Sequence, residues 1–199
     1  MLRERRRIGF FGGSFDPVHD GHLAMAESAR VAMNLHQVIF VPVASNPLKP
    51  TGPEASAPDR VEMLRLALGE RSGCSIWEGE LEREGPSYTY DTVRHLEQVY
   101  PNAHLFWIIG ADQLSGLRAW HRIEELVWRT DFILMRRPGH ELEWPGIPGL
   151  RLFLVENEAW RISSTEVRLA LRAGQAARLV PASVETYIRE RGLYGGHRS

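Results

Sequence analysis

The sequence predicts an α/β fold built on a doubly wound, mostly parallel sheet. Short apolar runs alternate with segments whose apolar residues recur at helical spacing, an order typical of a parallel sheet covered by helices on both faces. The chain has 199 residues, a length that one domain can fill, and no repeat, low-complexity stretch or linker divides it. We therefore expect a single domain over residues 1–199. Its arginine-rich head, residues 1–7, is expected to be frayed.

Continuous apolar runs predict the strands of the first part of the chain, and amphipathic spacing predicts its helices. A buried strand at 8–12 is followed by a helix at 22–35 and a second strand at 37–43. A loop rich in proline and asparagine then extends to about Ala57. The next helix is expected at 60–68.

The same alternation continues through the middle of the chain. A strand-like segment at 74–79 precedes a helix at 89–100. The strongly apolar run at 103–110 predicts another strand, and a helical stretch follows near 112–128. Two more strands are expected, at 131–137 and 150–156.

The C-terminal part, about 163–194, is expected to be helical. Ser163 and Glu166 have the spacing of a capping box, which marks a helix start. Pro181 suits the first position of a second helix. The ends of these two helices are marked by Gly174 and Gly192.

Charge and cysteine content exclude several classes of protein. Lysine and arginine total 24 against 25 acidic residues, so a general nucleic-acid-binding surface is not expected. Cys74 is the single cysteine and cannot form an internal disulfide. No apolar run is long enough to span a bilayer. We expect a cytoplasmic protein that binds neither nucleic acid nor membrane; its oligomeric state is left open.

The stretch GGSFDPVHDGH, residues 12–22, lies between the first strand and the first helix. In parallel sheets, ligands bind at the carboxyl ends of the strands, and two glycines allow a phosphate close to the backbone. Asp16-Pro17 predicts a turn with proline at or near the first helical position. His19 and His22 would share one face of the first helical turn, where free N–H groups favour an anion.

Other interpretations of this stretch remain open. A Gly-Gly pair also marks ordinary turns. Asp16, His19 and His22 could propose a metal triad, although no further fixing partners are evident nearby. The dinucleotide fingerprint G-x-G-x-x-G does not follow this strand, and the P-loop pattern is absent from the chain, so neither of these phosphate sites is predicted.

A second candidate phosphate site is RISSTEVR, residues 161–168. Its hydroxyls and free N–H groups open a helix, so they could converge on one anion. Arg168, within the next turn, could bind a phosphate through its fork of N–H groups. A plain capping box explains Ser163 and Glu166 equally well. The coincidence of two such motifs favours the phosphate interpretation.

The segment His19-Asp20-Gly21-His22, with every element of G-G-x-F-D-P-x-H-x-G-H, resembles the (H/T)xGH signature of the nucleotidyltransferase superfamily. From Ile8 to Tyr194 the chain resembles bacterial nicotinate-mononucleotide adenylyltransferases. The resemblance implies a Rossmann-like nucleotidyltransferase fold with C-terminal helices. It implies catalytic roles for the two histidines at the ATP phosphates. It implies ATP-binding roles for Gly12, Gly13, Ser14, Phe15, Gly110, Asp112, Ser163, Ser164, Thr165 and Arg168.

The acceptor site is also expected from this resemblance. Asp112 follows a strand, where a carboxylate can accept from ribose hydroxyls. Trp120 could stack on a flat ring, or it could simply pack locally. The chain has Leu48 where the family often has histidine. The residues that the resemblance assigns to the pyridine nucleotide are Lys49, Ser87, Tyr88, Thr89, Trp120 and Arg136.

The expected reaction is transfer of AMP from ATP to nicotinate mononucleotide, with Mg²⁺ delivered by ATP rather than held in a protein cage. Both substrates carry their own reacting groups, so no covalent nucleophile is needed. The alternatives are a nicotinamide-mononucleotide or pantetheine-phosphate adenylyltransferase, and a sensor that binds the nucleotides without turnover.

Overall fold

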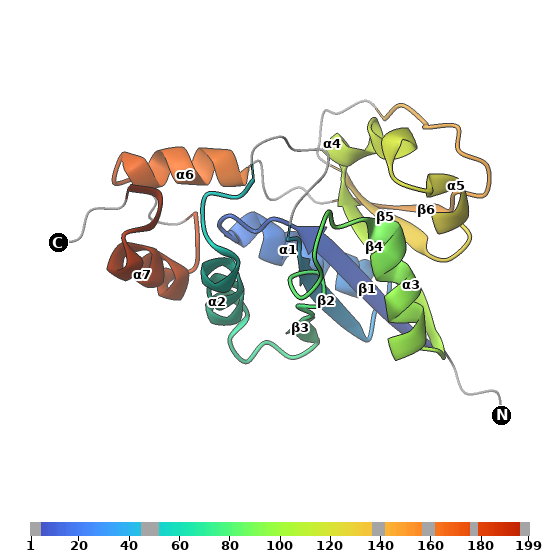
Figure 1. Cartoon of the computed structure of the whole chain (residues 1–199), viewed down its shortest axis with the longest axis horizontal. Helices are drawn as coiled ribbons and strands as arrows, with labels where there is room; N and C mark the ends of the chain where they lie inside the picture. The colour runs from blue at the N-terminus through green and yellow to red at the C-terminus, as the bar shows by residue number, and fades with distance from the viewer. Residues whose placement is uncertain (1–4, 45–51, 137–141, 157–161, 176–178, 196–199) are drawn as a thin grey trace.

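The computed structural model describes residues 5–44, 52–136, 142–156, 162–175 and 179–195. Its centre is a six-stranded sheet with the strand order β3-β2-β1-β4-β5-β6, in which every neighbouring pair is parallel. The doubly wound parallel sheet predicted from the sequence is therefore confirmed (Figure 1). The strands are β1 (Arg6–Gly13), β2 (Gln37–Pro42), β3 (Cys74–Ile76), β4 (Ala103–Gly110), β5 (Asp131–Arg136) and β6 (Leu152–Glu156).

Helices cover both faces of the sheet. The helices are α1 (Asp20–Ala32), α2 (Ala57–Leu68), α3 (Thr89–Val99), α4 (Ala111–Leu114), α5 (Ile123–Leu126), α6 (Ser164–Arg172) and α7 (Ala182–Arg191), with 3-10 turns η1 (Leu117–Ala119) and η2 (Leu193–Gly195). Successive side chains of a strand point to opposite faces. In β1, Phe11 lies in the core shared with α1, α2, α6 and α7. Ile8 and Phe10 lie in the core shared with α3 and α5.

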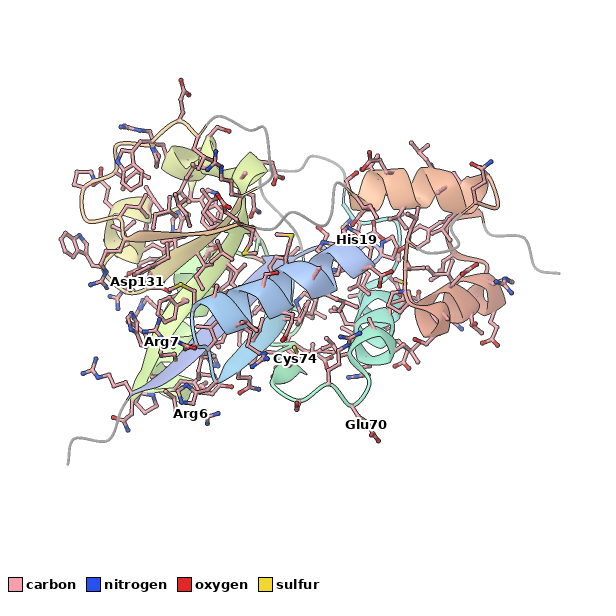
Figure 2. The ribbon with its side chains drawn as sticks, turned by 180° about the vertical axis from the view of Figure 1, so that it is seen from behind. Arg6, Arg7, His19, Glu70, Cys74 and Asp131 are labelled. Atoms are coloured by element: carbon pink, nitrogen blue, oxygen red, sulfur yellow. The ribbon has the colours of Figure 1, made fainter. Side chains whose placement is uncertain are left out.

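The first strand is longer than its apolar run. Arg6 and Arg7 pair with Ala103 and His104 of β4, so these two residues are not frayed as expected, and residues 1–4 lie outside the described part of the chain. The Arg7 Nε donates to the Met33 carbonyl at 2.9 Å. These arginines lie at the end of β1 that is remote from His19 (Figure 2). The apolar pattern did not include these two arginines in the strand. An arginine can pair through its backbone while its charged head reaches the surface.

Three other expectations about helix boundaries were wrong. The stretch near 112–128 is not one helix but α4, η1 and α5, interrupted at Arg122, whose φ is +52°. Asp16-Pro17 does not open α1 at its first helical position: the peptide is cis, and α1 begins at Asp20 with His19 as its N-cap. Pro181 likewise is the N-cap of α7 rather than its first residue. The predicted helix ends at Gly174 and Gly192 have φ of +68° and +63°, as such ends require.

The strand order reverses between β1 and β4. β2 and β3 lie on one side of β1, whereas β4, β5 and β6 lie on the other. The chain leaves β1 towards α1 and leaves β4 towards α4, so both helices start at the same edge of the sheet. This switch point is where open α/β sheets bind their ligands.

The C-terminal helices close the fold beside that edge. α7 packs against α2, and Val167, Val184 and Ile188 are buried in the core that also holds residues of α1 and α2. Figure 1 shows α6 and α7 gathered beside α2, at the side of the sheet where α1 begins. In the described part of the chain, no helix is long and apolar enough to cross a membrane.

Replacing Gly12 with alanine is expected to destabilise the fold by about 1–3 kcal/mol, the usual cost of overpacking a core. A Cβ at this position would lie 2.7 Å from Cζ2 of Trp107, a ring that is 3% exposed and has little room to move. Urea unfolding of Gly12→Ala measures the loss. Gly52→Ala is the control, because nothing lies within 4 Å of its added Cβ. Equal stability of both variants and the parent chain would contradict this packing argument.

Candidate active site

The two histidines of the first motif lie against each other at the start of α1. Their ring centroids are 3.7 Å apart with an interplanar angle of 28°. His19 is buried and His22 is partly exposed. The backbone N–H of His19 donates to Nδ1 of His22 at 3.3 Å. In the neutral ring the proton of His22 is therefore on Nε2, which makes Nε2 the nitrogen able to donate to a ligand.

The buried ring of Phe15 packs against His22, one of these two histidines. Its ring is 1% exposed and packs edge-on against Phe11 at 5.6 Å and against His22 at 5.1 Å. Its φ of +49° is uncommon for a residue with a side chain. The Phe15 ring is a core group, so only its backbone is left for the predicted contact with ATP.

The predicted role of the two glycines acquires a second explanation. A side chain at Gly12 would meet Trp107, and one at Gly13 would lie 3.0 Å from the Phe15 ring. Protein side chains thus fill the space that these glycines leave open. Close approach of a phosphate to this backbone stays a prediction.

The carboxylate of Asp16 is buried and is bonded by protein groups on both oxygens. Oδ2 accepts from the N–H of Glu54 at 2.7 Å. Oδ1 accepts from the N–H of Ala55 at 3.0 Å and from the hydroxyl of Tyr194 at 2.7 Å. The carboxylate is therefore committed to hydrogen bonds, and no group of three or more metal-ligating side chains occurs within the described residues. The alternative of a metal triad finds no support.

The two predicted phosphate motifs meet. The hydroxyl of Ser164 donates to the carbonyl of Pro17 at 3.1 Å, across 147 residues of sequence. NH1 of Arg168 donates to the carbonyl of Asp16 at 2.8 Å. The start of α6 therefore lies directly on the loop that precedes α1, and Thr165 is exposed in the first turn of α6. Figure 2 shows His19 at the end of α1 that faces these C-terminal helices.

The capping box predicted for α6 is also present. The Ser163 hydroxyl accepts from the Glu166 N–H at 3.3 Å, and the Ser163 N–H donates to the Glu166 carboxylate at 2.7 Å. Capping and phosphate binding are compatible interpretations, because the cap uses Ser163 while Ser164 and Arg168 contact the loop. Local sequence could not separate the two.

The loop between β1 and α1, residues 14–18, is fixed by donors to its carbonyl groups. Besides the two contacts from α6, NH1 of Arg60 donates to the carbonyl of Ser14 at 2.7 Å. Arg60 is 2% exposed, and burial lowers the pKa of its guanidinium, partly offset by Asp16. Arg60 and Arg168 bring positive charge to this loop, which suits an anionic ligand. At the helix start itself, the Asp20 N–H is bonded to the Leu179 carbonyl at 3.2 Å, so α1 presents fewer open N–H groups than expected.

Arg168 has a second partner. Its Nε donates to the carboxylate of Glu54 at 2.7 Å, and Arg172 donates to the same carboxylate at 2.6 Å. Arg168 is therefore in an ion pair at the position where the sequence predicts a phosphate.

The end of β4 lies at the switch point, as predicted. Gly110 is the N-cap of α4, and a Cβ at Gly110 would lie 2.5 Å from Oδ1 of Asp112 and 4.0 Å from Met25 of α1. Asp112 is exposed. Its carboxylate is thus close to the strand end beside α1; contact with a ribose stays a prediction.

Three of the predicted acceptor residues, Ser87, Tyr88 and Thr89, lie at the start of α3, near the end of β2. The Ser87 hydroxyl accepts from the Ala44 N–H at 3.3 Å, which joins it to the end of β2. Tyr88 is the N-cap of α3 and Thr89 is its first residue. The Tyr88 ring lies 4.4 Å from that of His121. His121 was missed by the sequence analysis; its position next to Trp120 was the available signal.

The remaining predicted acceptor residues do not all lie near Ser87, Tyr88 and Thr89. Trp120 is partly buried, packs on the core and lies 6.3 Å from Phe132, so local packing accounts for part of its role. Arg136 ends β5, two strands from β1, and lies 3.6 Å from the Glu156 carboxylate. Lys49 and Leu48 lie outside the described residues.

Glu80 is a second residue that sequence reasoning missed. It is 2% exposed, and its Oε1 accepts from the Thr92 hydroxyl at 2.5 Å. NH2 of Arg83 donates to the same hydroxyl at 2.6 Å. Burial raises the pKa of the Glu80 carboxyl, while hydrogen bonds from Thr92 and Ser87 and the charge of Arg83 lower it. Glu80 thus lies beneath the segment that contains Ser87.

Comparison with known proteins shows which family this chain resembles. The profile of the cytidylyltransferase-like family matches residues 10–170. A Geobacillus kaustophilus protein named "Probable nicotinate-nucleotide adenylyltransferase" is 43% identical and covers 95% of this chain and 86% of its own length. The Bacillus subtilis nicotinate-nucleotide adenylyltransferase is 39% identical, with coverages of 95% and 98%. The structure of Plasmodium falciparum nicotinic acid mononucleotide adenylyltransferase complexed with NaAD has a TM-score of 0.80 at 20% identity, covering 98% of this chain and 100% of its own. At that identity the likeness concerns the fold.

Glu80 gives the site a testable dependence on pH. A carboxyl whose pKa is raised in the folded state binds more protons when folded, so stability falls as pH rises above its ordinary value of 4.5. The Glu80→Gln variant lacks this titration. We expect the free energy of unfolding of Glu80→Gln to increase relative to that of the parent protein as pH rises above about 4.5, measured by urea unfolding at several pH values.

The control for this experiment is Glu84→Gln, which changes an exposed glutamate of the same loop and the net charge equally. A difference between Glu80→Gln and the parent protein that does not vary with pH would contradict the burial argument.

Proposed function

The chain belongs to the cytidylyltransferase-like family and, within it, to the nicotinate-nucleotide adenylyltransferases, and on this basis we propose that it transfers AMP from ATP to nicotinate mononucleotide. The products are nicotinate adenine dinucleotide and pyrophosphate. The observation that carries the proposal is the meeting of two motifs: Ser164 and Arg168 of α6 bond the loop that leads to His19 and His22.

The proposed step is a direct displacement at phosphorus. An oxygen of the acceptor's 5′-phosphate forms a bond to the α-phosphorus of ATP, and the bond from that phosphorus to the bridging oxygen breaks, so pyrophosphate leaves with the electron pair. No covalent nucleophile of the protein is required. Cys74 is unsuited to that role, because it lies on β3 and burial raises the pKa of its thiol.

Catalysis by this site would come from alignment and charge. Holding two substrates in line can supply about 7–11 kcal/mol of the barrier. Nε2 of His22 is proposed to donate to the α-phosphate or to the departing pyrophosphate, where negative charge develops. His19 is proposed to contact the same phosphates, because its ring is stacked on that of His22.

The outer phosphates of ATP are proposed to bind at the start of α6. Ser164, Thr165 and Arg168 are on one helical turn there, and Arg60 adds positive charge beneath the loop. A phosphate reaching Arg168 would compete with Glu54 for the guanidinium. ATP binding is therefore expected to release Glu54 from Arg168.

The acceptor is proposed to bind between the end of β2 and the start of α3. The rings of Tyr88 and His121 lie 4.4 Å apart with an interplanar angle of 31° and form an aromatic surface there, and an aromatic surface suits a flat pyridine ring. Trp120 lies next to His121 in sequence and would border the same pocket.

We also propose that Mg²⁺ enters with ATP. The phosphate oxygens of ATP are the hard ligands that Mg²⁺ prefers, and the ion usually keeps several waters. The cytoplasm is the proposed location, which the supply of ATP supports.

Pyrophosphate release tests the proposed function. Purified protein with Mg-ATP is compared with nicotinate mononucleotide, nicotinamide mononucleotide and phosphopantetheine. Fast release with the first and slow release with the others is expected. Equal rates with both pyridine nucleotides would broaden the substrate. Phosphopantetheine as the only acceptor would overturn the assignment, and saturable nucleotide binding without pyrophosphate release would indicate a sensor.

His22→Ala is expected to lower kcat on the order of 10²–10³-fold, as removal of one preorganised donor does. The same pyrophosphate assay measures this change. His95→Ala is the control, because His95 is exposed on α3 and its ring lies 5.4 Å from that of Trp77. An unchanged kcat in His22→Ala would remove His22 from the catalytic assignment.

A further inference from the structure

The C-terminal end of the described chain reaches into the phosphate site. Tyr194, in η2, is 6% exposed, and its hydroxyl donates to Oδ1 of Asp16 at 2.7 Å across 178 residues of sequence. Asp16 is itself 4% exposed. A tyrosine on a terminal turn is thus hydrogen-bonded, in the interior, to the loop that precedes α1.

We propose that Tyr194 is a positioning residue for ATP: its hydroxyl fixes the Asp16 carboxylate, and Asp16 in turn fixes the phosphate loop and the guanidinium of Arg168. The proposal rests on the proposed function, because it takes this loop as the site of the ATP phosphates.

Asp16 is the link between Tyr194 and both halves of the site. Its carboxylate accepts from the N–H groups of Glu54 and Ala55, just before α2. Its carbonyl accepts from NH1 of Arg168 at 2.8 Å, and the same NH1 lies 3.9 Å from Oδ2. A rotation of the Asp16 side chain would break its hydrogen bonds to residues 54 and 55 and its 3.9 Å contact with NH1 of Arg168 together.

The Tyr194 hydroxyl is held as a donor. Burial raises the pKa of this phenol, and its hydrogen bond to the Asp16 carboxylate raises it further, against smaller opposing effects of Arg168 and Arg60. The proton therefore stays on the phenol oxygen near neutral pH. A carboxylate that is removed from water requires such donors, because each unmet acceptor costs free energy.

The backbone around Tyr194 is shaped for this contact. Tyr194 has a φ of +56° between Gly192 at +63° and Gly195 at +73°. A left-handed conformation is unfavourable for a residue with a bulky side chain, and such residues persist where the surroundings over-determine them. The turn after α7 thus pays a conformational cost that directs the phenol towards Asp16.

Tyr187 provides a matched control on the neighbouring helix. Its hydroxyl donates to Oδ1 of Asp59 at 2.9 Å, so it is also a tyrosine–aspartate pair between the C-terminal region and α2. Asp59 is bonded to Ser56 and Arg191. None of these groups belongs to residues 14–18.

The test compares Tyr194→Phe with Tyr187→Phe in the full-length protein. Calorimetry gives the Kd of a non-hydrolysable ATP analogue with Mg²⁺, and steady-state assays give kcat and both KM values. Tyr194→Phe should weaken analogue binding and raise the KM for ATP by roughly tenfold, the size expected for loss of one hydrogen bond to a charged acceptor. The KM for nicotinate mononucleotide should stay within about twofold, and Tyr187→Phe should change neither constant.

The split between the two substrates decides the inference. Unchanged analogue binding in Tyr194→Phe, or equal losses for both substrates in both variants, would overturn it, because the hydroxyl would then be only structural. If Tyr194→Phe does not fold, Asp16→Asn is measured instead, with the same ATP-specific loss expected and the same outcomes overturning it.

Failure of the proposed function gives a different result. A parent protein that binds the ATP analogue but does not release pyrophosphate with nicotinate mononucleotide contradicts the function, while the ratio of the two Kd values still decides the role of Tyr194. A parent protein that does not bind the analogue overturns both.

Discussion

A carboxylate can be buried only when hydrogen bonds replace the water it loses, and in this protein that requirement organises the whole phosphate end of the fold. Asp16 obtains its donors from two N–H groups at residues 54 and 55 and from Tyr194. The start of α2, the loop after β1 and the last turn of the described chain are therefore held at one point. Because Arg168 bonds the carbonyl of Asp16, α6 is held there as well. Satisfying one buried charge thus also assembles a cationic site.

The sheet determines where this assembly can act. The strand order reverses between β1 and β4, and both strands end at the same edge, so their loops face a shared space. The groups proposed to bind phosphate lie after β1 and at the start of α6, whereas the aromatic pair of Tyr88 and His121 lies at the start of α3 and after η1. An enzyme that joins two anionic substrates without a covalent intermediate needs little beyond such placement and charge.

The two ends of the site are constructed differently. The phosphate end is fixed by hydrogen bonds between residues far apart in sequence. The proposed acceptor end depends on a buried carboxyl and one backbone contact: Glu80 accepts from Thr92 of α3, and Ser87 accepts from the Ala44 N–H beyond the end of β2. In addition, Arg168 already carries a carboxylate ligand from Glu54. The arginine is thereby charge-paired, and a phosphate that bound it would take the place of Glu54.

Much of this protein follows from its sequence alone. Periodicity predicts the six parallel strands, because burial of an apolar run on both faces leaves few alternatives. The histidine motif and the serine motif were both predicted at helix starts, and the structure brings them together. Binding of phosphate there stays a prediction. Local pattern could not reveal that Phe15 is a core residue, that Pro17 lies outside α1, or that Asp16 is bonded to Tyr194. Those facts depend on the direction of side chains and on contacts between residues as many as 178 positions apart in sequence. Tertiary structure decides them because a hydrogen-bond partner is chosen by proximity in the folded core, which residue spacing does not encode.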